Sequence, residues 1–128
     1  METENAHGPE LLTVASTATD GTTVVTVTGE IDHTTAAPLI HALDLGELRV
    51  VVDMRHVTFM DSSGINVLLV AHRELTQADG WLRLAGVPTS VLRTLQIVGI
   101  DAVIPCYIDL HEALEAWGNI RADQSETP

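Results

Sequence analysis

Lysine is absent from this chain of 128 residues, and its basic side chains are six arginines. Eighteen acidic residues bring the formal net charge to −12 at pH 7. Nucleic-acid binding depends on basic side chains that neutralise phosphates, so we expect no direct binding of DNA or RNA, and no adhesion to anionic lipid. The missing ammonium group excludes a Walker-type phosphate loop and a Schiff base. The acidity favours a basic protein partner instead.

Cysteine and long apolar runs are also scarce. Cys106 is the single cysteine, so no disulfide can form within the chain. No apolar run approaches the ~18–20 residues that a membrane-spanning helix needs. The opening segment is polar and acidic, "METENAHGPE", which is unlike a secretory signal peptide. We therefore expect a cytoplasmic protein without a membrane span.

The sequence gives little support for metal binding or catalysis. No two histidines have the i,i+4 spacing of a helical zinc site; they are His7, His33, His41, His56, His72 and His111. The Gly-x-Ser-x-Gly elbow of serine hydrolases is missing, and a triad of Ser62 with a distant histidine rests on no motif. Cys106 falls in a predicted strand and is interpreted as a small core residue. Asp53 ends an apolar run, as in a phosphoaspartate receiver, but such a receiver also needs a lysine. We expect no enzyme activity, no catalytic residue, no metal and no cofactor.

The length fits one domain, which we place at residues 10–118, with loose polar tails at 1–9 and 119–128. Apolar periodicity and turn signals predict strands at 11–17, 22–31, 48–54, 81–87 and 102–108, and helices at 32–45, 62–78, 89–99 and 109–117. The order is β-β-α-β-α-β-α-β-α. Strand–helix–strand units cross over right-handedly. The predicted fold class is therefore α/β: a mixed, mostly parallel sheet that is covered by helices.

Four local signals refine this prediction. Asp20-Gly21 lies between the first two strands and predicts an antiparallel hairpin. Pro38 fits only the first turn of a helix, so that helix should begin near Thr34 or Thr35. Pro105 within the last strand indicates an edge or a bulge. The run "LRVVVDM" at 48–54 is typical of a strand that is buried on both faces.

The stretch "MDSSGI" opens the clearest helix of the chain. Asp61 or Ser62 can be the helix N-cap, with its side-chain oxygen accepting a free backbone N–H. A second interpretation fits the same place, because a helix N-terminus tolerates an added phosphoryl group. Asp32 also follows a strand, and such corners gather at one end of a parallel sheet. Spacing alone leaves both interpretations open.

Three blocks of sequence carry a resemblance to a known family. They are "VVTVTGEIDHTTAAPL" (24–39), "VVVDMRHVTFMDSSGINVLL" (50–69) and "LRTLQIVGIDAVIPCYIDLHEAL" (92–114). In this order they resemble the STAS domain: a second strand and first helix, then the central Asp-Ser-Ser-Gly signature, then the last strand and helices. The resemblance covers roughly residues 11–117, nearly the whole chain.

Single-domain members of that family are bacterial anti-sigma factor antagonists. The resemblance implies that the unmodified protein binds an anti-sigma factor with serine kinase activity, which frees the sigma factor. It further implies that the kinase phosphorylates Ser62 to end binding, and that a PP2C-type phosphatase reverses this. Asp61 would shape the acceptor site, Ser63 would support the cap, Gly64 would let the partner's backbone approach, and Asp32 would contact the partner.

The family leaves another function open. STAS domains also serve in stress-signalling and lipid-transport complexes, so the chain could be a scaffold subunit in which Ser62 is only part of a cap. Some members bind purine nucleotide, but this chain has no phosphate loop to support that. We expect a monomer or a weak dimer.

Overall fold

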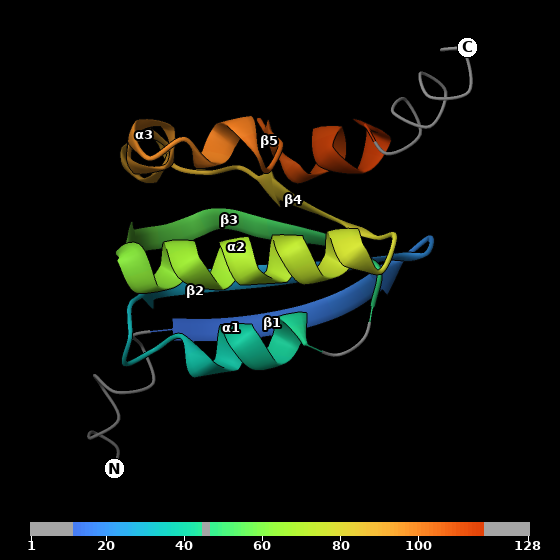
Figure 1. The fold of residues 1–128 in the computed structure, drawn as a ribbon, viewed down its shortest axis with the longest axis horizontal. Coiled ribbons are helices and arrows are strands. Elements are labelled where there is room, and N and C mark those ends of the chain that lie inside the picture. Colours follow the sequence, from blue (N-terminus) through green and yellow to red (C-terminus); the bar gives the residue numbers. More distant parts are fainter. Residues whose placement is uncertain (1–11, 45–46, 117–128) are drawn as a thin grey trace.

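The computed structural model describes residues 12–44 and 47–116, which form one mixed five-stranded sheet with helices packed on it (Figure 1). The strands are β1 (Leu12–Thr19), β2 (Thr22–Ile31), β3 (Arg49–Met60), β4 (Trp81–Ala85) and β5 (Cys106–Tyr107). The helices are α1 (Ala37–Leu43), α2 (Ser62–Gln77), α3 (Thr89–Ile97), the 3₁₀ helix η3 (Ile100–Ala102), and a last helix that covers residues 110–116 of the described chain. The predicted tails and domain limits lie outside the described residues.

Strand order in the sheet follows chain order, β1-β2-β3-β4-β5. β1 and β2 are antiparallel, and each later strand is parallel to the one before it. Asp20 and Gly21 both have positive φ values, 50° and 81°, as the tight hairpin turn requires. The predicted hairpin and mostly parallel sheet are therefore confirmed.

The core lies on both faces of the sheet. On one face, apolar residues of β2, β3 and β4 pack against α1, α2 and α3 in a single large cluster. On the other face, Val51 and Ala85 pack against Ala113 of the last helix. Val50 and Val52 belong to the first cluster and Val51 to the second, which is the double burial that the apolar run predicted.

α1 begins later than expected. Its first residue is Ala37, with Pro38 in the first turn, rather than Thr34 or Thr35. The intervening residues form a turn in which the Thr35 backbone N–H donates to the Asp32 carbonyl at 3.1 Å. Side-chain hydrogen bonds of this turn compete with helix formation, so the helix starts only after them.

β3 is longer than predicted, and β5 is shorter. β3 continues beyond Met54 to Met60, because β2 also continues and pairs with it as far as Ile31, with two irregularities in register. The predicted strand at 102–108 is confined to Cys106–Tyr107. Gly99 adopts a left-handed backbone, φ 84°, and leads into η3, which takes up the start of that segment.

Within the described chain, no helix is both long enough and apolar enough to cross a membrane.

Candidate functional site

Two acidic residues lie at neighbouring strand ends. Asp32 follows β2 and Asp61 follows β3. Ile31 and Met60 are partners in the parallel register, and the Asp61 backbone N–H donates to the Ile31 carbonyl at 3.2 Å. α1 and α2 both begin at this end of the sheet (Figure 1). The two corners that the sequence placed at one end are therefore joined by a hydrogen bond.

Asp61 is the N-cap of α2. Its Oδ1 atom accepts the backbone N–H groups of Ser63, at 2.8 Å, and of Gly64, at 3.3 Å. Its backbone is extended, as an N-cap residue requires. Of the two residues that the sequence allowed for this role, the structure selects Asp61, and the Ser62 side chain is not needed to cap the helix.

Ser62 is the first residue of α2, and its side chain is exposed. Ser63 is half-buried, and its contribution to the cap is the backbone N–H that Asp61 accepts. Neither serine hydroxyl makes a hydrogen bond to any described residue, so the two differ in exposure. Of the two, Ser62 presents the more exposed hydroxyl.

Asp32 is held in a compact turn. Its Oδ1 atom accepts the Thr34 backbone N–H at 2.8 Å, the Thr34 hydroxyl at 2.7 Å and the Thr35 backbone N–H at 3.1 Å. Hydrogen bonds from Thr34, and then from Thr35, lower the pKa of the Asp32 carboxyl below its ordinary value. Its Oδ2 atom receives no hydrogen bond from the described residues, so the charged carboxylate keeps one oxygen available for a partner.

Gly64 is buried where α2 meets the strand ends. A Cβ atom at this position would lie 2.6 Å from Met60 Cγ and 2.8 Å from Ile31 Cγ2, closer than real Cβ contacts. This close packing is sufficient to explain a glycine here. The expectation that Gly64 lets a partner's backbone approach stays a prediction.

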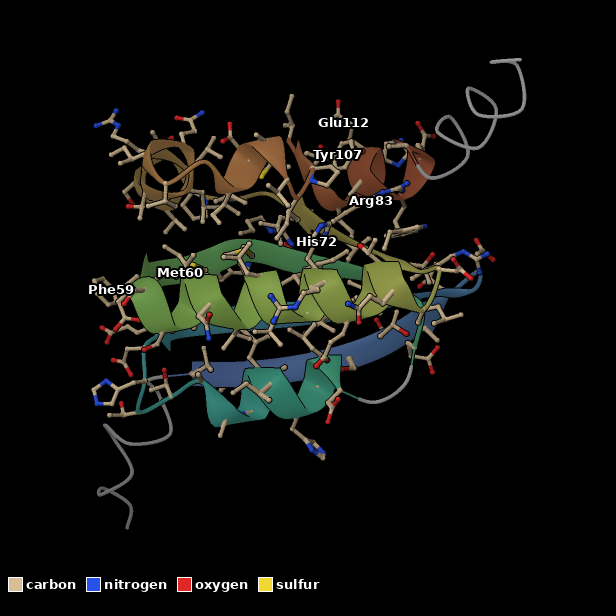
Figure 2. The ribbon with its side chains drawn as sticks, in the orientation of Figure 1. Phe59, Met60, His72, Arg83, Tyr107 and Glu112 are labelled. Carbon is tan, nitrogen blue, oxygen red and sulfur yellow. The ribbon has the colours of Figure 1, made fainter. Side chains whose placement is uncertain are left out.

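Phe59 was not singled out from the sequence. It lies near the start of α2, next to Met60 in Figure 2, and it is 47% exposed although it belongs to β3. The sequence pattern did not mark it, because Val57 and Met60 are buried while Thr58 and Phe59 between them are exposed, which breaks the alternation expected of a strand. Phe59 therefore adds an exposed aromatic ring at the end of β3, two residues before Asp61.

Asp53 and Cys106 lie away from this site. Asp53 is buried within β3, with its carboxylate 3.8 Å from the Arg55 guanidinium. Cys106 packs against the large core cluster, and burial raises the pKa of its thiol, with a smaller contribution from Asp101. Its interpretation as a small packing residue fits this position.

Comparisons with protein families, with curated proteins and with solved structures agree with one another. The family model described as "STAS domain" matches residues 13–113. The chain is 29% identical over 122 residues to "Anti-sigma-F factor antagonist RsfB" of Mycobacterium tuberculosis, covering 91% of this chain and 98% of the relative. It is 29% identical over 92 residues to "Anti-sigma F factor antagonist" of Paenibacillus polymyxa, covering 68% and 79%. A crystal structure of an anti-sigma factor antagonist from Mycobacterium paratuberculosis superposes with a TM-score of 0.78 at 28% identity, covering 85% of this chain and 96% of the other.

Proposed function

Because the chain belongs to the STAS domain family, we propose that it is an anti-sigma factor antagonist whose binding is switched by phosphorylation of Ser62. In the unmodified state it binds an anti-sigma factor that is also a serine kinase, and so releases a sigma factor. The observation that carries this proposal is the exposed hydroxyl of Ser62 at the first position of α2, directly after Asp61 and at the end of the sheet where β2 leads into Asp32.

The position of Ser62 suits a reversible switch. An exposed hydroxyl can enter a kinase and later a PP2C-type phosphatase without unfolding of the domain. The N-terminus of α2 has a partial positive charge that tolerates the phosphate, and Asp61 still caps the helix. Phosphorylation therefore changes the surface while leaving the fold in place.

The phosphate acts on binding through its charge. It adds about −1.5 to −2 charges next to Asp61 and near Asp32. A partner that covers this surface must remove water from the phosphate, and any acidic group that it brings is repelled. Unfavourable charge contacts at an interface cost several kcal/mol, and each ~1.4 kcal/mol weakens binding tenfold. Phosphorylation of one serine is thus sufficient to release the partner.

The neighbouring residues form the rest of the docking surface. Asp61 fixes the start of α2 and so the direction of the Ser62 side chain. Asp32 offers a carboxylate oxygen to a donor on the partner. Phe59 supplies exposed apolar area at the same end of the sheet. Together they combine an apolar anchor with polar groups, as protein interfaces do.

The test is phosphorylation by an anti-sigma factor kinase from the same genome, followed by intact mass spectrometry. Wild-type protein and Ser63→Ala should each gain one phosphate, whereas Ser62→Ala should gain none and should still bind the kinase. Ser62→Glu should bind about tenfold or more weakly, since one carboxylate supplies part of the charge of a phosphate.

Phosphate uptake by Ser62→Ala would refute the assignment of the site. A wild-type protein that ignores every such kinase, and that forms large assemblies in size-exclusion chromatography, would support the scaffold function instead.

A further inference from the structure

A groove runs between α1 and α2, from about one helical turn after Ser62 toward the C-terminal end of α2. It consists of two hollows of about 240 and 190 Å³. Both hollows are lined by the same four residues, Leu43, Asp44, Ala71 and Glu74, so they form one continuous depression. In Figure 1 the two helices run in the same direction, with α1 beside β1 and α2 in front of the central strands.

The floor of the groove is apolar and open to solvent. Ile40, Val67 and Val70 line the first hollow, and Leu48 lines the second. Ile40 is 49% exposed and Leu48 is 45% exposed. Large apolar side chains that line a hollow rather than a convex surface are typical of a site where another protein docks.

The rim of the groove is acidic. Asp44 and Glu74 line both hollows, Glu47 lines the second, and all three residues are exposed. The ion pairs between described residues join Arg55 to Asp53 and His111 to Glu115, so neither engages these three carboxylates. An apolar floor under three carboxylates is complementary to an amphipathic segment that carries Lys or Arg beside apolar residues.

The groove begins beside the proposed phosphorylation site but extends far from it. Asn66, one helical turn after Ser62, lines the first hollow. Glu74 is twelve residues beyond Ser62, which places it about 18 Å along the helix. This distance is about twice the ~8 Å over which charges interact at physiological salt. A partner can therefore contact both places, while a phosphate on Ser62 has little effect at Glu74.

We propose that the groove binds a basic amphipathic helical segment of the anti-sigma factor, with its apolar side chains on the floor and its Lys or Arg side chains at the rim. This inference rests on the proposed function and extends its docking surface. The two ends have separate tasks: the Ser62 end responds to phosphorylation, and the groove supplies affinity that is the same in both phosphorylation states.

The first experiment measures the dissociation constant of the complex between this protein and the kinase that phosphorylates Ser62. Glu74→Lys should weaken binding about tenfold, because it places a like charge against the basic segment. Glu115→Lys is the control, because it reverses the same charge at an exposed position on the last helix, which covers the opposite face of the sheet, and the ion pair with His111 that it breaks lies within that helix. Ile40→Gln should weaken binding about fivefold, and its control is Ile97→Gln on α3, where the isoleucine is 78% exposed.

The same measurements in the Ser62→Glu background test the separation of tasks. Glu74→Lys should weaken binding by the same factor there, because distant sites act additively. If Glu74→Lys and Ile40→Gln bind like wild type while Ser62→Glu binds weakly, the groove proposal is wrong and the proposed function stands. If Glu74→Lys and Ile40→Gln weaken binding no more than their control variants do, the loss of affinity reflects the overall charge or hydrophobicity of the protein, and the groove proposal is again wrong.

A second experiment does not depend on the kinase. A designed Leu/Lys peptide of about five helical turns is added to ¹⁵N-labelled protein, with a Leu/Glu peptide of the same length as control. The Leu/Lys peptide should shift the amide signals of Val67 and Val70, and Glu74→Lys should abolish these shifts. Shifts that spread over the whole surface, or that persist in Glu74→Lys, would overturn the proposal even if the proposed function fails.

Discussion

Gly64→Ala is the change that most directly tests how α2 is seated on the sheet. The added methyl would lie 2.6 Å from Met60 Cγ and 2.8 Å from Ile31 Cγ2. The Met60 side chain can rotate away, but the Ile31 branch is attached to a stiff β-branched residue in a fully buried position. The helix start must therefore shift, or one of the two core side chains must leave its position.

The expected cost follows from two opposing effects. Overpacking of this kind costs about 1–3 kcal/mol, and replacing glycine by alanine inside a helix gains up to ~1 kcal/mol. Gly64 is in the first turn, where only part of that gain is realised. We expect a net loss of about 1–2 kcal/mol in the free energy of unfolding, or a fall in Tm of about 5–10 °C.

The assay is urea unfolding followed by circular dichroism, with Asn66→Ala as the control. Asn66 is exposed in the same helix, so its replacement reports helix propensity alone and should be neutral or stabilising. In an Ile31→Ala background the cost of Gly64→Ala should fall by about 1 kcal/mol, because the Cγ2 atom that cannot move away is gone. Equal costs in both backgrounds, or a Gly64→Ala protein as stable as wild type, would refute the clash.

Two further predictions concern the charged groups. Thr34→Ala should raise the pKa of Asp32 in a ¹³C NMR titration, because it removes the hydroxyl that donates to the carboxylate, and an unchanged pKa would contradict this. In wild type the pKa of Asp32 is lowered by folding, so the turn is stabilised above the ordinary aspartate pKa and loses this stabilisation as pH falls through the folded pKa. Arg83→Met should speed amide hydrogen exchange across the last helix, residues 110–116, and leave β2 and β3 protected, because the buried Arg83 guanidinium donates to the Ala113 carbonyl of that helix at 3.1 Å. Uniformly faster exchange in all elements would instead indicate global destabilisation.

Arg83 also illustrates what the sequence could not reveal. Its guanidinium lies 3.8 Å from the centroid of the Trp81 ring, and burial lowers its pKa. Figure 2 shows Arg83 below the last helix, with Tyr107 nearby. A strand pattern "WLRLA" indicates only that one side chain in five is charged. That this charge is buried beneath a helix depends on where residues 110–116 return in space.

The hairpin turn and the helix starts show where local sequence signals were sufficient to predict the structure. Asp20-Gly21 specified the hairpin, because the left-handed conformations of its turn favour those two residues. Asp-Ser-Ser-Gly specified the start of α2 to within a residue, because an N-cap carboxylate acts within one helical turn. By contrast, Pro38 led to a predicted start of α1 near Thr34 or Thr35, before the observed start at Ala37, because the sequence pattern did not reveal the hydrogen bonds of the Asp32 turn.

The site was only partly predictable for the same reason. Ser62 and Asp61 are adjacent in the chain, so their arrangement is local and the motif indicated it. Phe59 is exposed beside them because β3 continues past the predicted strand end, and that depends on its pairing with β2. The rim of the groove joins Asp44 to Glu74, which are thirty residues apart, and no local pattern relates two such positions.

The sequence by itself determined the strand and helix order, the hairpin, the cap at Asp61 and the serine that follows it, because each depends on interactions within a few residues. The tertiary structure alone decided that Gly64 packs against Ile31, that Arg83 lies beneath the last helix, and that α1 and α2 enclose an acidic groove. Those features arise from contacts between distant segments, whose geometry is set by the register of the sheet and the packing of helices on it.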